Sequence, residues 1–385
     1  MKIINTVKQI FTNGKFDKDG KNTSQSAFLQ EEAKALTCEK KEPECDPKIV
    51  TIGGGTGLST MLRGLKAYSS NITVVVTVAD DGGGSGVLRQ DLGMLPPGDI
   101  RNCILALANT EPIMEKLLQY RFQDGMLKGQ SFGNLFLAAM DGICSSFEQA
   151  VQRMSDVLAV KGRVLPVTLQ DIKLCAQLED GYVIVGESKI GEHHKFHKGA
   201  IEKVYLEPEF VEPLDEVIEA INDADVIVLG PGSLYTSIIP NLLVNGVCEA
   251  IRDSKALKVY VCNVMTQPGE TEGYSVEDHI RAIERHSFKG IVDYCIYNTA
   301  DIPEDLKKKY RDDGAEVVRL SSEDMRIPGI KFLGEDFVCI NNSYVRHDTK
   351  RLAQTIINLV EKSLFSRDNK MSTYYYKNKF KNLAQ

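Results

Sequence analysis

The sequence predicts an α/β protein with a Rossmann-like, mostly parallel sheet that is flanked by helices and carries a small β-rich insertion. Two observations predict this fold. Short β-branched runs, typical of buried strands, end repeatedly in glycine-rich loops, and amphipathic helical patterns follow those loops. Between about residues 162 and 206 the pattern changes to short strands, with a hairpin signal at Asp180-Gly181.

The composition is that of a soluble protein. The chain has 385 residues, of which 43% are hydrophobic and 26% charged, and its net charge of −7 argues against a general nucleic-acid binder. Nine cysteines without a CxxC spacing fit a reducing cytoplasm. No apolar run approaches the roughly 20 residues of a membrane span, and no signal-peptide pattern opens the chain.

The α/β pattern covers residues 48–362, and the two ends differ from it. Residues 1–47 are polar, with weak periodicity, so we expect a disordered or loosely helical extension. The tail 363–385 is basic and contains Tyr374-Tyr375-Tyr376, and we expect it to be solvated.

The first strand, Lys48–Ile52, ends in the loop Gly53-Gly54-Gly55-Thr56-Gly57, and a helical pattern begins at Leu58. Glycine lets the backbone approach a ligand closely, and the start of a helix offers free N–H groups that suit phosphate. We therefore predict that Gly54 to Gly57 bind a nucleotide or phosphate; a plain βα turn is the alternative. Leu58 replaces the third glycine of the dinucleotide fingerprint, and there is no Walker A loop.

The strand at 72–78 ends in Asp80-Asp81 and a second glycine-rich run. Ligands of open α/β sheets bind at the carboxyl ends of strands. Asp80 also follows the first loop at the spacing of a ribose-binding acid. Alternatively, the two acids hold a metal ion, take a proton, or simply cap a turn.

A later strand repeats this pattern and ends in Gly230-Pro231-Gly232-Ser233. Hydroxyls of Ser233, Thr236 and Ser237 stand at the helix start that follows, so a second anion site is predicted there. Polar residues within 265–271, after the next strand, are expected to line the same crevice, and further strands are expected at 291–297 and 315–320.

Three other polar positions are less specific. Asp99 is expected to cap a helix through Leu105, and Asn134 either caps the next helix or places its amide against a ligand. His193, His194 and His197 have a spacing that could ligate zinc on a helix. Without a helical pattern or an acid pair nearby, a solvated, basic loop is the favoured interpretation.

Six ordered motifs in residues 48–362 resemble those of the YvcK group of gluconeogenesis factors, relatives of the 2-phospho-L-lactate transferase (CofD-like) family. The motifs are Gly53-Gly54-Gly55-Thr56-Gly57, Asp80-Asp81-Gly82-Gly83, residues 96–102 (Pro-Pro-Gly-Asp-Ile-Arg-Asn), residues 230–238, residues 262–271 and Arg346-His347-Asp348.

The resemblance implies a cytoplasmic regulator that binds a UDP-sugar, typically UDP-N-acetylglucosamine, and supports gluconeogenic growth and cell shape. It further implies a link to cell-wall precursor synthesis, in part through glutamine–fructose-6-phosphate aminotransferase. Two ligand-binding residues also follow from it: Tyr310, which precedes Gly314-Ala315-Glu316, and Arg346. An arginine offers forked donors to a diphosphate, and a tyrosine can stack on uracil, although Tyr310 could instead be a packing residue.

Two functions therefore compete. The first, favoured by the closer resemblance, is a UDP-sugar sensor without turnover. The alternative is a nucleotide-dependent transferase that acts on a deazaflavin acceptor, with Asp80 and Asp81 as catalytic residues and a need for magnesium. The absence of tryptophan and of an aromatic-rich stretch argues weakly against a flavin-like acceptor. A homodimer is compatible with either function.

Overall fold

The computed structural model describes residues 46–321, 327–341 and 344–367. Nearly all of the predicted extension 1–47 and most of the tail 363–385 lie outside the described residues.

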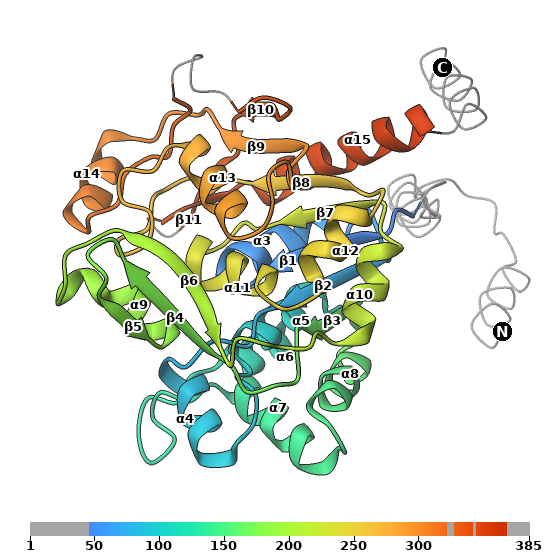
Figure 1. Cartoon of the computed structure of the whole chain (residues 1–385). Helices are drawn as coiled ribbons and strands as arrows, with labels where there is room; N and C mark the ends of the chain where they lie inside the picture. The colour runs from blue at the N-terminus through green and yellow to red at the C-terminus, as the bar shows by residue number, and fades with distance from the viewer. Residues whose placement is uncertain (1–45, 322–326, 342–343, 368–385) are drawn as a thin grey trace, which may run out of the picture. The chain divides into compact units, whose positions relative to one another are not determined.

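The core of the described part is a seven-stranded sheet in the order β10-β9-β8-β7-β1-β2-β3, and every neighbouring pair in it is parallel (Figure 1). The predicted class, a mostly parallel α/β sheet flanked by helices, is confirmed. The strands are β1 (Ile49–Gly53), β2 (Ile72–Val76), β3 (Arg163–Pro166), β7 (Val226–Leu229), β8 (Leu257–Val261), β9 (Tyr294–Asn298) and β10 (Lys331–Glu335).

The order of the strands reverses at β1. From β1 the chain builds β2 and β3 on one side, then returns to place β7, β8, β9 and β10 on the other side. Loops that leave neighbouring strands toward opposite sides open a crevice at the carboxyl ends of those strands. The reversal therefore places the crevice between the loops that follow β1 and β7, which are the two glycine-rich loops of the sequence.

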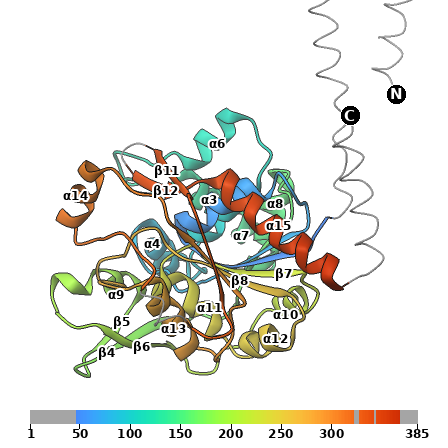
Figure 2. The ribbon, with the colours of Figure 1, turned by 90° about the horizontal axis from the view of Figure 1, so that it is seen from above.

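Helices cover both faces of this sheet (Figure 2). One face is covered by α3 (Gly55–Leu65), which packs on α5 (Gly98–Leu107) and on the last helix, α15 (Thr349–Arg367). The other face carries α10 (Asp215–Asn222), α11 (Ile239–Leu242), α12 (Val247–Asp253) and α13 (Val276–Arg285). The remaining α-helices are α4 (Gly83–Leu92), α6 (Pro112–Gln119), α7 (Phe132–Ile143), α8 (Phe147–Val157), α9 (Glu187–Glu192) and α14 (Glu304–Asp312).

The central strands are buried because helices cover both faces. Every residue of β1, β2 and β7 is buried, which explains their continuous runs of isoleucine and valine. On the helix side, Leu58, Met61 and Leu65 of α3 recur at helical spacing, and each is fully buried against the sheet. Burial of these residues fixes the position at which α3 begins, directly after the first loop.

The predicted β-rich insertion is a separate three-stranded antiparallel sheet in the order β5-β4-β6. Its strands are β4 (Lys173–Leu178), β5 (Val183–Val185) and β6 (Ile201–Glu207). The prediction began this insertion too early, because β3 pairs in parallel with β2 as the edge of the main sheet. A four-residue strand does not reveal in sequence which sheet it joins.

Two more expectations differ from the structure. Residues 315–320 form no strand; Val317 makes a single bridge with Met265, and β10 lies further along the chain. A last hairpin, β11 (Val338–Asn341) with β12 (Tyr344–His347), leads into α15. The carboxylate of Asp348 accepts the N–H groups of Lys350 and Arg351 and so caps that helix.

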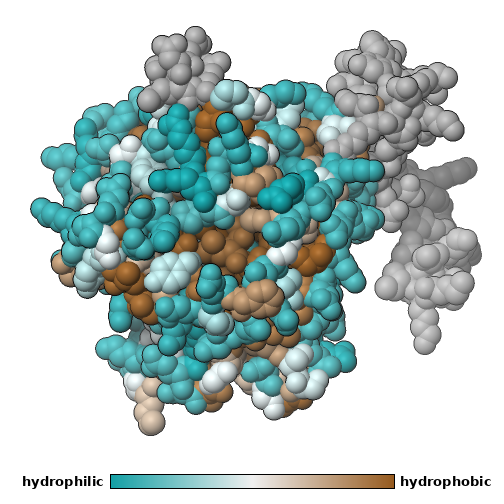
Figure 3. Space-filling model, in the orientation of Figure 1, coloured by the Kyte–Doolittle hydropathy of each residue, from teal (hydrophilic) through white to brown (hydrophobic). Residues whose placement is uncertain are grey.

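No single helix among the described residues is long and apolar enough to cross a membrane. One bent pair of helices, Leu234–Leu242 with Val247–Asp253, has the length and composition of a membrane span, but most of its residues are buried within the fold. The face seen in Figure 3 is mainly hydrophilic, and its hydrophobic residues gather near the centre of the view.

The contact between α3 and α15 gives a test of the packing. A Cβ on Gly64 would lie 2.2 Å from the Thr349 carbonyl oxygen and 2.9 Å from the Ala353 Cβ, so the helices would have to separate. We expect Gly64→Ala to lower the free energy of unfolding by about 1–3 kcal/mol. Gly142→Ala, in α7, meets nothing within 4 Å and should raise it by up to about 1 kcal/mol. Urea denaturation of both variants measures this, and a similar change in both would contradict the proposed contact.

Candidate functional site

The first loop turns sharply at the end of β1. Gly54 is extended (φ −174°), Gly55 has φ +73°, and α3 begins there without a side-chain cap. A left-handed residue at the second position favours glycine. The backbone N–H of Gly55 donates to the carboxylate of Asp99, so Asp99 holds this loop. The prediction that Asp99 caps α5 is wrong, because that helix has no side-chain cap. The N–H groups of Thr56 and Gly57, in the first turn of α3, have no partner within the helix.

The second loop, Gly230 to Ser233, lies in backbone contact with the first. A Cβ on Gly57 would lie 3.0 Å from the Pro231 carbonyl oxygen, and one on Gly232 would lie 2.9 Å from the Gly54 carbonyl oxygen. The side-chain amide of Asn263 holds Gly232 from the other side: it accepts from the Gly232 N–H (3.2 Å) and donates to the Gly232 carbonyl (2.8 Å). Gly57 and Gly232 are therefore required by the contact between the two loops.

A π-helical turn, η2 (Leu234–Ile238), follows the second loop, and its start is already bonded to a carboxylate. Glu270 accepts hydrogen bonds from the backbone N–H of Tyr235 (3.0 Å) and from the hydroxyl of Thr236 (3.1 Å). The second anion site that we predicted on this turn is thus occupied by a side chain of the protein, and Thr236 faces away from a ligand. Burial raises the pKa of Glu270 to about 7.

Between the two loops lies a cavity of about 390 Å³. It brings together predicted residues from the first loop, the second loop, α14 and β12, which are distant in sequence. Of the predicted ligand-binding residues, Gly55, Thr56, Gly57, Gly232, Ser233, Tyr310 and Arg346 line it. Residues 263–268 also line it, and of the polar residues expected within 265–271 these include Thr266 and Gln267. Gly54 and Gly230 shape the loops, whereas Asp80 and Asn134 do not line this cavity.

The part of the cavity lining that comes from α14 and β12 carries a positive charge, Arg346. The Tyr310 hydroxyl accepts the N–H of Val345 (2.9 Å), which fixes the strand that presents Arg346. Arg346 is exposed, and its guanidinium lies 5.3 Å from the Tyr344 ring. Its neighbour His347 is buried; burial lowers its pKa to about 4, so the imidazole is neutral at pH 7. Arg346 is therefore the charged donor that this strand offers to a ligand.

Asp80 belongs to a second set of groups, the acidic cluster, which comprises Asp80, Asp81, Asp99 and Glu187. Asp81 accepts the N–H of Ser188 (2.9 Å), which docks the start of α9 from the insertion onto the end of β2. Burial raises the pKa of Asp99 to about 6, and the charge of Asp80 adds to this shift. Burial likewise raises the pKa of Glu187 to about 8, with further contributions from Asp80, Glu270, Asp99 and Asp81.

The insertion histidines form no metal site. His193 is buried, and its ring nitrogens bond to the carbonyls of Ile190 (2.8 Å) and Gly199 (3.0 Å). His197 lies 2.7 Å from Asp180. No group of three histidine, cysteine, aspartate or glutamate side chains able to hold a metal occurs in the part of the chain that the structure describes. The predicted solvated loop is also wrong for His193, because residues 193–195 form a 3₁₀ turn packed on the insertion.

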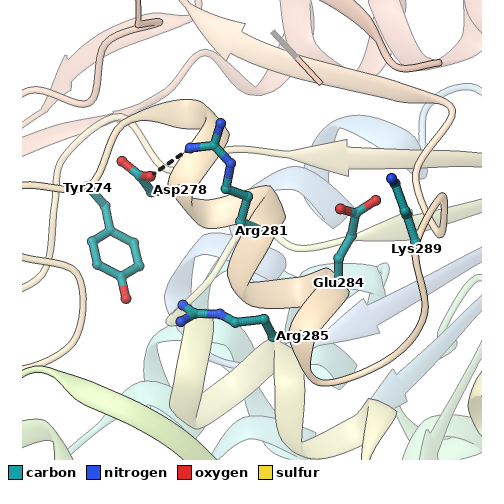
Figure 4. A pocket seen from close by; sticks show the side chains of 6 residues that line it. All are labelled: Tyr274, Asp278, Arg281, Glu284, Arg285 and Lys289. Atoms are coloured by element: carbon teal, nitrogen blue, oxygen red, sulfur yellow. Dashed lines mark hydrogen bonds and ion pairs between the residues drawn. The ribbon is translucent and has the colours of Figure 1, made fainter. Parts of the chain in front are cut away.

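A larger depression, about 500 Å³, lies on α13 (Figure 4). Its acids serve the backbone and neighbouring side chains: Asp278 bonds to Ser275 and Arg281, and Glu284 accepts the N–H of Gly290. All of its lining comes from residues 274–289, and no strand end contributes. We therefore place the candidate site at the two loops.

Several residues of the site were not predicted individually from the sequence. Asn241, in α11, donates to the carbonyl of Gly53 and fixes the end of β1, and Glu187 comes from the insertion. Asn263, Gln267 and Glu270 lie in or beside the segment expected to line the crevice, but sequence alone did not assign their partners. Their only signal was the run of polar residues after β8.

The raised pKa of Glu187 predicts a pH-dependent stability. From pH 4.5, its ordinary pKa, to about 8, the folded state keeps a proton that the unfolded state loses, so stability falls as pH rises through this range. In buffer with EDTA, we expect Glu187→Gln to be more stable than the parent at pH 8.5 by about 1–3 kcal/mol, and nearly equal at pH 4.5.

Glu192→Gln is the matched control on the same helix. Its carboxylate is exposed, and the hydrogen bond from Lys195 lowers its pKa, so no gain is expected at pH 8.5. Thermal unfolding at the two pH values compares the three proteins. If the two variants respond alike, Glu187 is not the group that titrates.

Comparison with known proteins identifies the family to which this fold and site belong. Residues 49–338 match the family model described as "2-phospho-L-lactate transferase CofD". A Thermoanaerobacterium thermosulfurigenes protein named "Putative gluconeogenesis factor" is 63% identical over 315 residues, which cover 82% of this chain and 97% of the relative. The Bacillus subtilis "Gluconeogenesis factor" is 47% identical over 316 residues, 82% of this chain and 98% of the relative.

A solved structure gives the same result. The crystal structure of a Bacillus halodurans member of the UPF0052 family has a TM-score of 0.77 and 46% sequence identity, and the match covers 81% of this chain and 99% of that one. The family model and the relatives agree on the same segment of the chain. The protein therefore belongs to the CofD family, within its YvcK group of gluconeogenesis factors.

Proposed function

We propose that this protein binds a UDP-sugar, UDP-N-acetylglucosamine in the first instance, in the cavity between the two loops. The observation that carries the proposal is that two kinds of donor line the same cavity. The N–H groups of Thr56 and Gly57 lie at the start of α3, and Arg346 lies on β12, which packs beside α3. A helix start and a guanidinium are both suited to phosphate oxygens, and a diphosphate would use both.

The proposed role is that of a cytoplasmic regulator that links carbon supply to cell-wall precursor synthesis and to cell shape under gluconeogenic conditions. The names of the relatives, gluconeogenesis factors, support the metabolic part of this role. Glutamine–fructose-6-phosphate aminotransferase is the protein partner we would test first, and a homodimer is the oligomer to look for. This regulatory role requires no deazaflavin acceptor, whereas a transferase would require one.

A nucleotide-dependent transferase of the CofD type is the second candidate. The acidic cluster favours it, because Asp99 lies next to the first loop, Asp80 lies near enough for its charge to act on Asp99, and both have carboxylate oxygens that suit Mg²⁺. The described residues contain no group of three metal ligands, so the phosphates of a nucleotide and water would have to complete the coordination. Bound Mg²⁺ would neutralise phosphate charge; Asp80 and Asp81 would be the catalytic candidates, and a deazaflavin the acceptor.

Calorimetric titration with UDP-N-acetylglucosamine, with and without magnesium, separates the two functions. Saturable binding without product formation supports the regulator. Binding only of guanosine nucleotides with magnesium, followed by turnover with a deazaflavin and a phospholactate-type donor, supports the transferase and would overturn the first proposal.

Arg346→Ala tests the part of the cavity that β12 lines. Loss of a charged hydrogen bond should weaken binding of UDP-N-acetylglucosamine by about 1.5–3 kcal/mol. Arg311→Ala is the matched control, because Arg311 is exposed on α14 near Tyr310, pairs with Glu304 and does not line the cavity. Calorimetry compares the three proteins; an unchanged affinity for Arg346→Ala would remove this residue from the site.

A further inference from the structure

Three side chains beside the second loop form a hydrogen-bonded relay, which we call the Glu270 relay: Glu270, Gln267 and Ser233. The Gln267 side-chain amide donates to Glu270 Oε1 at 2.7 Å, and the Ser233 hydroxyl donates to Gln267 Oε1 at 2.7 Å. Ser233 and Gln267 both line the cavity, whereas Glu270 is buried behind them. The relay therefore connects a buried carboxylate to the wall of the candidate site.

Glu270, at the buried end of the relay, determines which groups of the relay donate hydrogen bonds and which accept them. Four donors converge on the Glu270 carboxylate: the Tyr235 N–H, the N–H and the hydroxyl of Thr236, and the Gln267 amide. An ionised carboxylate can only accept hydrogen bonds. The amide of Gln267 must then turn its NH₂ group toward Glu270 and its oxygen toward Ser233. Whenever Glu270 is ionised, the orientation of this glutamine is fixed, because the opposite orientation would set two acceptors against each other.

The direction of the relay decides what Ser233 can offer to a ligand. A serine hydroxyl has one proton and two lone pairs. The proton is used in the bond to Gln267, so only lone pairs remain toward the cavity. A phosphate at neutral pH presents acceptor oxygens, which these lone pairs repel. A hydroxyl of a sugar carries the proton that Ser233 lacks.

Resting on the proposed function, we propose that Ser233 is a specificity-determining residue that accepts a hydrogen bond from one sugar hydroxyl of the UDP-sugar and does not bind phosphate. The phosphates are then left to Thr56, Gly57 and Arg346. Because Gly57 and Pro231 are in contact, a sugar next to the diphosphate lies within the span of the second loop. The first loop thus binds the phosphates of the ligand, and the second loop accepts a hydrogen bond from one of its sugar hydroxyl groups.

The test measures affinity for UDP-N-acetylglucosamine and for analogues in which one sugar hydroxyl at a time is replaced by fluorine, which cannot donate. Because burial raises the pKa of Glu270 to about 7, titrations at pH 8.5 keep its carboxylate ionised. The parent protein should lose about tenfold in affinity for one analogue. Ser233→Ala should lose about tenfold for the natural ligand and nothing more for that analogue.

Two further variants test the relay itself. Glu270→Gln can donate to Gln267, which frees the amide to turn and the Ser233 proton to face the ligand. Its discrimination against the same analogue should fall below about threefold. Thr236→Val is the matched control: it removes another donor to Glu270 but leaves Gln267 and Ser233 in place, so the tenfold discrimination should persist. Circular dichroism melting confirms that each variant is folded.

The outcomes separate this inference from the proposed function. If the parent protein binds no UDP-N-acetylglucosamine, both fall. If it binds, but Ser233→Ala weakens every ligand by the same factor or none of them, only the assignment of Ser233 falls. If Glu270→Gln keeps the full tenfold discrimination, the relay does not set the polarity of Ser233 and the inference is overturned.

Discussion

The site depends on direct backbone contact between the loops that follow β1 and β7. Side chains at Gly57 or Gly232 would place a Cβ within about 3 Å of the carbonyl oxygens of Pro231 and Gly54. The contact is possible only because the strand order reverses between β1 and β7, so that the two loops leave the sheet side by side. Everything else in the site, from the start of α3 to the cavity wall at Arg346, is positioned around this contact.

Two buried carboxylates hold the loops in this arrangement. Asp99 accepts the N–H of Gly55, and Glu270 accepts the N–H of Tyr235, so each helical start after a loop already has one internal anion. Holding a carboxylate in such a place is costly, which is why burial raises the pKa of both. The N–H groups of Thr56 and Gly57 are left for a ligand. The protein thus supplies one anion of its own at each helical start and leaves only the remaining N–H groups at the start of α3 for phosphate.

The insertion and the acidic cluster connect the rest of the molecule to this centre. Through Asp81 and Ser188 the insertion docks on the end of β2, and Glu187 lies among carboxylates that belong to the main sheet. The two candidate functions use different parts of this arrangement. A sensor needs the loop cavity and Arg346, whereas a CofD-type transferase would also use the acidic cluster. The Glu270 relay reaches the cavity through Gln267 and Ser233, and its proposed role is to recognise a ligand that carries a sugar.

The sequence by itself determined the parallel α/β class and both glycine-rich loops, whose residues line part of the cavity. Those properties are local: buried strands, a glycine loop and a helix start each have a pattern within about fifteen residues. It could not determine which sheet Arg163–Pro166 joins, that residues 315–320 make a single bridge and form no strand, or that Asp80 and Asn134 lie outside the cavity. Nor could it show that the anion at the second loop is Glu270. These outcomes depend on partners far along the chain, such as Asn263 on Gly232 and Glu270 on Tyr235, and only the tertiary fold brings such partners together.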